Sequence, residues 1–541
     1  MWKSFSCKAF GLLPAVVSYP CSLQGFFICP CLGTVNSPPS IHTSYTGDNS
    51  HSLYLLQTPF LSLPNGKTSA MKIEQIYTGC LAQGAYYIES EGEAVVIDPL
   101  REVQPYIDRA AKDGASIKYV FETHFHADFV SGHLDLSKKT GAPIVYGPTA
   151  KPDFEAITAT DGQQFKVGNI TFTVLHTPGH TMESTCYLLS DENGKDTAIF
   201  TGDTLFIGDV GRPDLAQKVV EDLTQEKLAS HLYDSLRNKI MPLADDIVVY
   251  PAHGAGSACG KNMSKETTDT LGHQKATNYA LQPMSREQFI KEVTDGLMPP
   301  PAYFPLNVMM NIQGYDSIDA VLERGQHAMS PKAFEAAANE TGALLLDTRA
   351  PLTFAQGFVP NSINIGIDGN FAPWVGAMIP DIKQEILLVT DPGREEEVIT
   401  RLARVGYDFT IGYLEGGFEA WKAAGMEVDH IKSVTAEELA AIMDKEPVNI
   451  LDVRKASEHY SEHIIGSENA PLDYINDSML KVDKNKTYYV HCAGGYRSMI
   501  FNSILRARGY DNLIDVQSGF DAIKSCGKFE VSAYVCPSTM L

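Results

Sequence analysis

The sequence predicts an α/β protein with several domains, and three observations lead to this prediction. The chain has 541 residues, too many for one hydrophobic core, and 44% of them are hydrophobic, as in an ordinary globular protein. In the first half, short apolar runs that end in His or Asp alternate with helical segments. In the second half, one sequence pattern occurs twice, which indicates a duplicated domain.

Charge and cysteine usage narrow the possible partners and compartments. The formal net charge of −23 and the pI near 5.0 argue against nucleic acid or an anionic membrane as partner. The ten cysteines form no paired framework, which is typical of a reducing compartment. We therefore expect a cytoplasmic protein that acts on small molecules, and a homo-oligomer is possible.

Residues 1–70 differ from the rest of the chain. No charged residue occurs between Lys8 and Asp48, yet prolines interrupt the apolar residues too often for a membrane-spanning helix. Lys3 and Lys8 precede an apolar run, so a sorting segment for export or an organelle is the alternative to a disordered extension. Folded structure is expected to start at Met71.

Residues 71–315 are expected to form the first domain. Helices are predicted near 103–112 and 215–237, between strand-like runs. These runs are 93–98, 117–124, 170–176, 197–203 and 247–253. Several of them end in residues that could bind a metal, which is where an assembled site needs its side chains.

The stretch 123–129 contains His, His and Asp at alternate positions. In a strand these side chains would point to opposite faces, so they can converge on one ion only if the backbone turns out of the sheet. Candidate ligands recur in later loops, in an order that is hard to ascribe to chance. The set comprises His124, His126, Asp128, His180, Asp203 and His253.

This set resembles the metallo-β-lactamase superfamily, and the resemblance implies an αβ/βα sandwich. Two-metal members of the superfamily continue the motif with another His, whereas this chain has Phe129. An apolar ring at that position favours one metal ion. It also argues against the two-metal thioester hydrolases of the glyoxalase II type.

Within the superfamily the chain is most similar to the persulfide dioxygenases. That similarity implies one Fe(II) per chain, with zinc as the alternative, held by His124, His180 and Asp203. Two imidazoles and one carboxylate leave positions open for O2 and substrate, as non-heme iron oxygenases require. Further residues would orient the ligands and water. They are His126, Asp128, His253 and Asp98, and a simple strand-end cap is an equally good interpretation of Asp98.

The residues that bind the carrier thiol are less clearly indicated. The resemblance suggests that Arg212 contacts a glutathione carboxylate, with an ordinary surface ion pair as the alternative. After His253 the chain has a Gly-rich segment instead of the Asp-Tyr of glutathione-using relatives. Lys261 and this segment could instead bind another anionic thiol, such as a coenzyme A persulfide. Cys259 is interpreted as structural.

Residues 316–326 are expected to be a linker to the duplicated part. The pattern beginning at Leu346 recurs at Leu451, and that beginning at Gly417 recurs at Gly519. The offsets of 105 and 102 residues are nearly equal. We therefore predict two similar domains, at residues 327–428 and 431–541.

In the second copy, Cys492 follows a strand and begins a glycine-containing loop that leads into a helix. Backbone N–H groups and the helix dipole would stabilise a thiolate there. The segment Cys492–Arg497 resembles the Cys-x-x-Gly-x-Arg loop of rhodanese sulfurtransferases, one residue shorter than the loop of related phosphatases. The resemblance makes Cys492 the sulfur carrier, and Arg497, Gly494 and Gly495 the groups that bind thiosulfate or sulfite.

The first copy has Asp391 at the position of the nucleophile. A carboxylate cannot carry sulfane sulfur, so this copy is predicted to be catalytically inactive and to pack between or position its neighbours. The whole chain is then expected to oxidise a thiol persulfide with O2 to sulfite and to exchange sulfane sulfur with thiosulfate. The alternatives are a zinc-dependent hydrolase with a rhodanese module and a non-catalytic sulfane-sulfur carrier.

Overall fold

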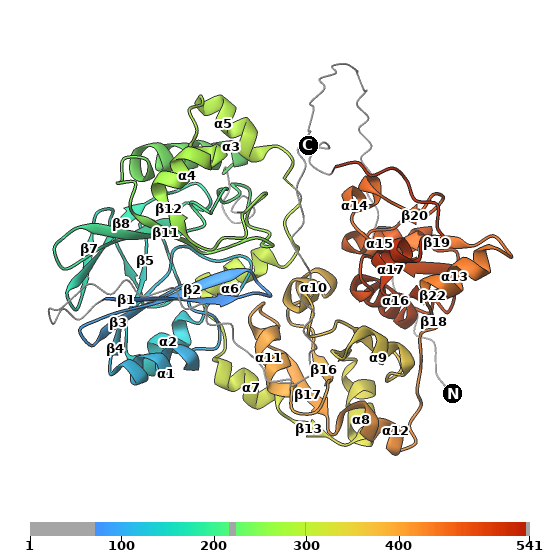
Figure 1. Cartoon of the computed structure of the whole chain (residues 1–541). Coiled ribbons are helices and arrows are strands. Elements are labelled where there is room, and N and C mark those ends of the chain that lie inside the picture. The colour runs from blue at the N-terminus through green and yellow to red at the C-terminus, as the bar shows by residue number, and fades with distance from the viewer. Residues whose placement is uncertain (1–70, 216–222, 298, 537–541) are drawn as a thin grey trace, which may run out of the picture. The chain divides into compact units, whose positions relative to one another are not determined.

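The computed structural model describes residues 71–215, 223–297 and 299–536. These residues form a two-sheet α/β domain followed by two smaller α/β domains (Figure 1). The prediction for residues 1–70 lies outside the described residues. No helix among the described residues is long and apolar enough to cross a membrane.

The first sheet is antiparallel over β1 to β3 and parallel from β3 to β6. Its strands are paired in chain order. They are β1 (Lys72–Thr78), β2 (Gln83–Ser90), β3 (Glu93–Ile97), β4 (Ser116–Phe121), β5 (Ile144–Tyr146) and β6 (Ile157–Thr158).

The second sheet has the order β12-β11-β10-β9-β8-β7, and only its β10–β11 pair is parallel. Its strands are β7 (Gln164–Val167), β8 (Ile170–His176), β9 (Thr185–Ser190), β10 (Asp196–Gly202), β11 (Val248–Pro251) and β12 (Asp269–Thr270). The helices of this part are α1 (Gln104–Asp113), α2 (His133–Thr140), α3 (Gln225–Ser235), α4 (Leu271–Thr277), α5 (Arg286–Thr294) and α6 (Phe304–Gln313).

Alternating side chains explain how the two sheets are layered. Along β2, Tyr86 and Ile88 point into a core shared with Phe172 and Phe200 of the second sheet. Their neighbour Tyr87 packs instead in a core that contains Tyr106 of α1. Successive residues of a strand face opposite sides, so each sheet buries one face on the other sheet and one on helices.

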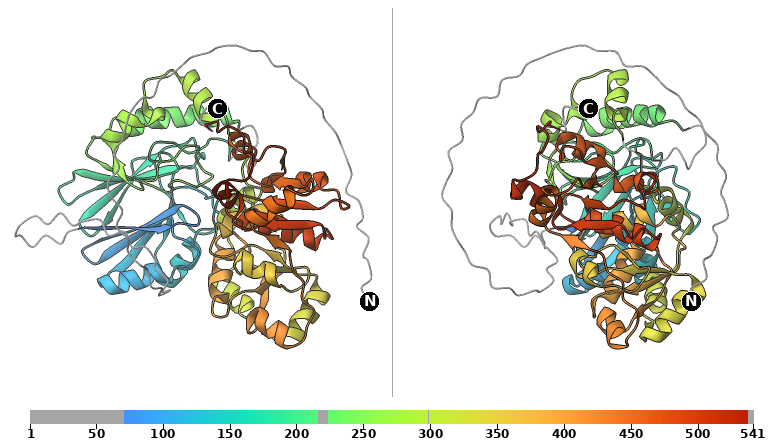
Figure 2. Two further views of the ribbon diagram at one scale, coloured as in Figure 1. Left: turned by 45° about the vertical axis from the view of Figure 1, so that its right-hand side comes forward. Right: turned by 90° about the vertical axis from the view of Figure 1, so that its right-hand side faces the viewer.

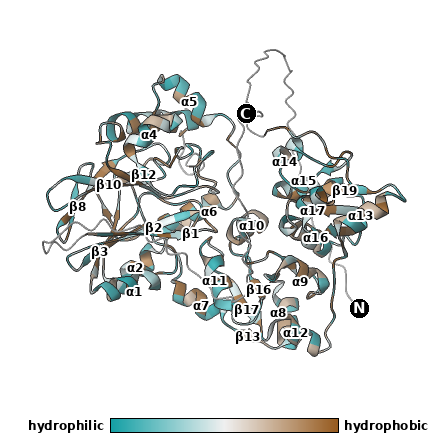
Figure 3. Ribbon diagram, viewed as in Figure 1, coloured by the Kyte–Doolittle hydropathy of each residue, from teal (hydrophilic) through white to brown (hydrophobic). Residues whose placement is uncertain are grey.

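The resulting order is helix, sheet, sheet, helix, and it confirms the predicted αβ/βα sandwich. Helices α1 and α2 cover the first sheet, whereas α3 to α5 cover the second (Figures 1 and 2). Hydrophobic residues concentrate in the strands, while α1 and α5 carry many hydrophilic residues, as expected of an outer layer (Figure 3).

Two expectations for this part of the chain differ from the structure. The helix predicted from 215 begins instead at Gln225, because Thr224 caps it by accepting a hydrogen bond from the Lys227 N–H. Residues 216–222 of that prediction lie outside the described residues. The expected linker 316–326 contains a helix, α7 (Ile318–Gly325), whose residues Ile318 and Val321 are buried.

The two smaller domains have the same topology, which confirms the duplication. The sheet orders, β13-β17-β16-β14-β15 and β18-β22-β21-β19-β20, correspond strand for strand, and all pairs are parallel. The first copy contains β13 (Ala328–Met329), α8 (Pro331–Thr341), β14 (Leu344–Asp347), α9 (Pro351–Gln356), β15 (Ile363–Asn364), α10 (Phe371–Met378), β16 (Ile386–Val389), α11 (Glu395–Ala403), β17 (Thr410–Leu414) and α12 (Gly417–Ala423). The second contains β18 (Ser433–Val434), α13 (Ala436–Met443), β19 (Asn449–Asp452), α14 (Ala456–Ser461), β20 (Glu468–Asn469), α15 (Ile475–Ser478), β21 (Tyr488–His491), α16 (Tyr496–Ala507), β22 (Leu513–Val516) and α17 (Gly519–Cys526).

Candidate functional sites

The predicted metal ligands follow strands of both sheets in the first domain. His124 comes after β4, His180 lies between β8 and β9, and Asp203 follows β10. Potential donor atoms of these three residues lie within 4.8 Å of one another, and all three side chains are buried. The structure therefore brings together the three residues to which the sequence assigns the metal.

Hydrogen bonds to neighbouring groups set the tautomers of both imidazoles. The hydroxyl of Thr123 donates to Asp98 Oδ2 at 2.8 Å, so it can only accept from His124 Nδ1, 2.9 Å away. His180 Nδ1 donates to the Arg212 carbonyl at 2.9 Å. Each Nε2 is left with its lone pair, and these atoms lie 3.8 and 3.4 Å from Asp203 Oδ2.

The donor set fits a divalent cation. Burial lowers the pKa of His124, and the nearby imidazoles lower it further, so the ring stays neutral. Within the described part of the chain, no N–H or O–H group donates to either buried oxygen of Asp203. A buried carboxylate without such donors is costly unless a cation neutralises it.

His126 belongs to an adjoining buried cluster, and its ring centroid lies 4.3 Å from that of His124. Its Nε2 lies 3.1 Å from Asp98 Oδ1 and 3.3 Å from Glu122 Oε2. Burial lowers the pKa of His126, but the two carboxylates outweigh burial and leave this pKa well above its usual value. A protonated ring cannot donate a lone pair to a metal. Glu122 is not among the residues selected from the sequence, although a glutamate directly after an apolar strand is a recognisable signal.

A third cluster joins the predicted supporting residues to Cys259. His253 Nε2 lies 3.4 Å from Asp128 Oδ2 and 3.5 Å from Asp203 Oδ1. Potential donor atoms of Asp128, His253 and Cys259 lie within 4.8 Å of one another. Burial and the charges of both aspartates raise the pKa of the Cys259 thiol. Phe129, the residue after Asp128, packs against His126, with ring centroids 4.3 Å apart.

The two residues proposed to bind the carrier thiol are engaged elsewhere. The Arg212 guanidinium forms a bidentate pair with Asp214, at 2.6 and 2.7 Å, while its carbonyl orients His180. The Lys261 ammonium donates to the carbonyl oxygens of Glu292 and Asp295 at the end of α5. Lysine at this position stabilises the negative end of the helix dipole.

The Cys492 loop adopts the predicted arrangement of strand, turn and helix. Cys492 follows β21 and is 1% exposed, and its Sγ accepts a hydrogen bond from the Gly495 N–H at 3.1 Å. Gly495, at φ 94°, caps α16. Arg497 forms a bidentate ion pair with Glu458, at 2.6 and 2.8 Å, which the sequence analysis missed. Gly494 has open space on its Cβ side.

The first copy has the same turn without the thiol. The predicted position of the nucleophile is wrong by one residue, because the pairs Asp347–Val389 and Asp452–His491 make Thr390, not Asp391, the counterpart of Cys492. Thr390 is buried, whereas Asp391 is the next residue and is exposed, and the loop runs on through Gly393 to α11. Arg394 there forms ion pairs with Asp368 and Glu397. The loop geometry is therefore retained, while the group that could carry sulfur is missing.

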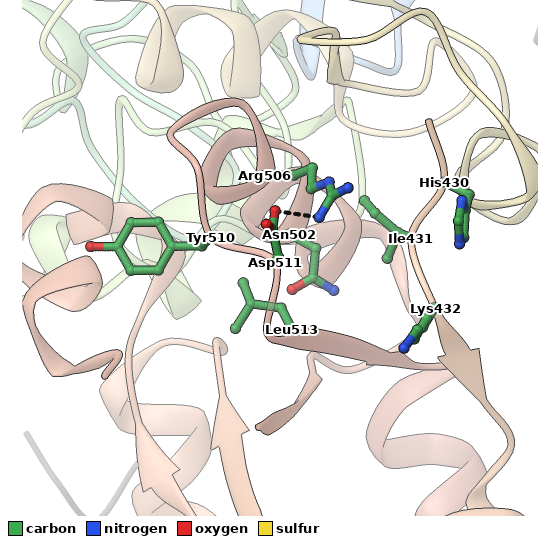
Figure 4. Close-up of a pocket in the computed structure, with 8 residues that line it drawn as sticks. All are labelled: His430, Ile431, Lys432, Asn502, Arg506, Tyr510, Asp511 and Leu513. Carbon is green, nitrogen blue, oxygen red and sulfur yellow. Dashed lines mark hydrogen bonds and ion pairs between the residues drawn. The ribbon is translucent and has the colours of Figure 1, made fainter. Parts of the chain in front are cut away.

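A cavity of about 290 Å³ lies in the second rhodanese-like copy, between α16, β22 and the segment before β18 (Figure 4). Its lining includes none of the metal-cluster residues and no residue of the Cys492 loop. Asn502 and Arg506 come from the middle and end of α16, and Arg506 pairs with Asp511, which also lines the cavity.

Comparison with known proteins agrees with this architecture. Residues 78–253 match the metallo-beta-lactamase superfamily, and residues 330–424 and 435–526 each match the rhodanese-like domain. A solved structure described as a metallo-beta-lactamase from Staphylococcus aureus is 32% identical, with a TM-score of 0.55. The match covers 64% of this chain and 99% of that one. The chain therefore belongs to the metallo-beta-lactamase superfamily, and two rhodanese-like domains follow its metallo-beta-lactamase domain.

Curated relatives of the first domain have two different activities. The hydroxyacylglutathione hydrolase of Tolumonas auensis is 34% identical over 172 residues, which is 31% of this chain and 60% of the hydrolase. Human persulfide dioxygenase ETHE1 is 27% identical over 257 residues, which is 47% of this chain and 92% of the dioxygenase. The chain thus spans less than two thirds of the Tolumonas hydrolase. These relatives leave both hydrolysis and persulfide oxidation open for the first domain.

Proposed function

We propose that the first domain is a mononuclear iron persulfide dioxygenase and that the last domain is a thiosulfate sulfurtransferase. The observation that carries the first half is that His124, His180 and Asp203 bring donor atoms within 4.8 Å of one another, whereas His126, although its ring lies beside that of His124, directs Nε2 to Asp98 and Glu122. Asp98 and Glu122 lie 3.1 and 3.3 Å from His126 Nε2 and raise the pKa of this ring, which favours a set of two imidazoles and one carboxylate, His124, His180 and Asp203, for the metal. When bound there, Fe(II) would supply the site at which O2 and the persulfide react.

The overall oxidation balances as follows. A persulfide R–S–SH, O2 and water give the thiol R–SH, sulfite and two protons. The sulfane sulfur loses four electrons to O2, and its bond to the carrier sulfur breaks. His253 lies within 3.5 Å of both Asp203 and Asp128, which places it beside the ligands to orient water.

The second half of the proposal rests on Cys492 and its loop. The Cys492 thiolate attacks the outer sulfur of thiosulfate, a sulfur–sulfur bond forms, and sulfite leaves. A low-molecular-weight thiol then takes that sulfur from Cys492 and restores the thiolate. The Gly495 N–H stabilises the negative sulfur, and Arg497, which pairs with Glu458 in this structure, would bind the anion by exchanging that partner. Persulfide and sulfite are common to both reactions, so the two domains can exchange intermediates.

Metal content and oxygen uptake test the proposal together. We expect about one iron per chain, and O2 consumption with glutathione persulfide or coenzyme A persulfide. His180→Ala should abolish O2 uptake and leave thiosulfate transfer, whereas Cys492→Ser should do the reverse. An iron-loaded wild-type enzyme that consumes no O2 with either persulfide would contradict the dioxygenase half.

A zinc-dependent thioester hydrolase is the second candidate. The cluster of Asp128, His253 and Cys259 beside Asp203 supports it, because these donors could hold a second ion. This candidate predicts about two zinc ions per chain and hydrolysis of a glutathione thioester. The same metal analysis therefore distinguishes the two functions.

A further inference from the structure

The inactive rhodanese copy contacts the catalytic loop of the active copy directly. Tyr496, the fifth residue of the Cys492–Arg497 segment, donates a hydrogen bond from its hydroxyl to the Gly366 carbonyl at 2.6 Å. Gly366 follows β15 of the inactive copy. The catalytic loop is thereby tied to a domain that has no sulfur-carrying group of its own.

The loop that contains Gly366 and Gly369, here called the receiving loop, leaves space for an aromatic ring. A Cβ atom added at Gly369 would lie 2.3 Å from Tyr496 Cε2 and 2.5 Å from Cζ, far inside van der Waals contact. At Gly366 the corresponding distance to Cε2 is 3.3 Å. Gly369 does not have a positive φ, so its backbone does not require glycine. The space taken by the Tyr496 ring is what excludes a side chain at this position.

The rest of α16 extends the same contact. Met499 and Ser503 lie three and seven residues after Tyr496, on the same face of the helix. Met499 packs with Phe354 and Phe358 of the inactive copy. The Ser503 hydroxyl accepts a hydrogen bond from the Asn364 N–H at 2.9 Å. Contacts at Tyr496, Met499 and Ser503 therefore fix one face of α16 against the inactive copy.

Residues in and after the degenerate loop of the inactive copy hold the receiving loop in place by hydrogen bonds. Arg394 occupies the end of the turn where the active copy has its anion-binding loop, and it forms a bidentate pair with Asp368, at 2.9 and 2.8 Å. Asp368 lies between Gly366 and Gly369, against which Tyr496 packs. The Arg401 guanidinium donates to the Ile367 carbonyl at 2.7 Å. The basic residues of α11 and its preceding turn thus hold the loop that holds Tyr496.

We propose that the degenerate rhodanese copy holds the Cys492 loop in its active conformation, and that Tyr496 is the positioning residue through which it does so. The inference rests on the proposed sulfurtransferase activity, which it deepens. Tyr496 follows the Gly495 N–H that donates to Cys492 Sγ at 3.1 Å. Fixing Tyr496 in the inactive copy therefore fixes the direction of that N–H toward the sulfur.

The test uses the full chain and two independent readouts. The first is the rate of Cys492 alkylation by iodoacetamide as a function of pH, followed by mass spectrometry of the Cys492 peptide. The second is kcat and KM for sulfur transfer from thiosulfate to cyanide. Alkylation needs no sulfurtransferase turnover. A wild-type chain that transfers no sulfur would thus refute the proposed function. Alkylation would still test whether the inactive copy holds the Cys492 loop through Tyr496.

We expect Tyr496→Ala to shift the pH midpoint of alkylation upward and to lower kcat at least about tenfold, since misplacing a reacting group by about 1 Å can cost about 100-fold. Tyr496→Phe keeps the ring and loses one hydrogen bond, so its loss should be about fivefold or less. Tyr534→Ala, a change at an exposed tyrosine near the end of the described chain, should behave as wild type.

Gly369→Ala tests the same contact from the other domain. It should reproduce the Tyr496→Ala effect, whereas in a Tyr496→Ala background it should add nothing, because the ring it collides with is gone. If Tyr496→Ala is insoluble, Gly369→Ala and Tyr496→Phe carry the comparison. Wild-type alkylation and turnover in Tyr496→Ala, or additive effects in the double variant, would overturn the proposal.

Discussion

Thr123→Val is the sharpest test of how the first domain prepares its metal ligands. The hydroxyl of Thr123 is buried and makes two hydrogen bonds, one donated to Asp98 at 2.8 Å and one accepted from His124 Nδ1 at 2.9 Å. Valine has nearly the same shape but can make neither bond. The variant therefore removes the group that orients His124 without opening a cavity.

The size of the effect follows from these two contacts. A buried hydrogen bond to a charged group contributes about 1.5–3 kcal/mol and a neutral one about 1 kcal/mol. Removing a partner that orients a metal-bound histidine typically weakens metal affinity about 10- to 100-fold, equivalent to roughly 1.4–2.8 kcal/mol. We expect a loss of metal affinity within that range and a lower free energy of unfolding.

Chelator competition followed by elemental analysis measures the affinity, and oxygen uptake with a persulfide measures the consequence. Thr171→Val, at a half-buried threonine on β8, is the matched control and should bind metal as wild type does. Metal affinity unchanged in Thr123→Val would refute the idea that this hydroxyl sets the tautomer of His124.

Three further predictions concern stability and anion binding. Burial raises the pKa of Asp515 to about 7. The pKa of an unfolded aspartate is about 3.9. Protonated Asp515 therefore adds at most about 4 kcal/mol to the free energy of unfolding, and this contribution is complete below about pH 4 and lost by about pH 7. Asp515→Asn should thus raise the melting temperature at pH 8 and much less at pH 5, and an equal gain at both would contradict this account. Glu458→Gln removes the charge that compensates Arg497 and should lower KM for thiosulfate about two- to fivefold in steady-state kinetics; a raised KM would argue against it. Phe129→Ala empties a fully buried site and should cost about 3–5 kcal/mol in denaturant unfolding, so a loss under about 1 kcal/mol would show that the site collapses freely.

The sequence indicated candidate metal ligands that the structure brings together. His124 and Asp203 follow apolar runs and His180 follows the turn after β8, while the family resemblance selected these three from a larger set of candidates. Cys492 could be placed because a strand, a Gly-rich turn and a helix leave a local pattern. Such signals need no knowledge of tertiary contacts.

Partners far apart in the chain left no comparable signal. Glu458 precedes Arg497 by 39 residues, and only the folded domain brings them together. The structure likewise pairs Arg212 with Asp214, and Lys261 with carbonyls at the end of α5, so any substrate would compete with these partners. Whether a charge is available depends on its neighbours in space, which residue spacing does not specify.

Charge balance is a further argument for one metal ion. Asp203 and Asp128 contribute two negative charges to the buried clusters, and one divalent cation cancels both. A second divalent ion would need about two more negative charges, from a Cys259 thiolate and a bound hydroxide. Burial and both aspartates raise the pKa of Cys259, so the thiolate forms only if a second cation is present to stabilise it. Occupancy by a second ion should therefore rise steeply with pH, whereas the first ion, held by His124, His180 and Asp203, needs no thiol deprotonation.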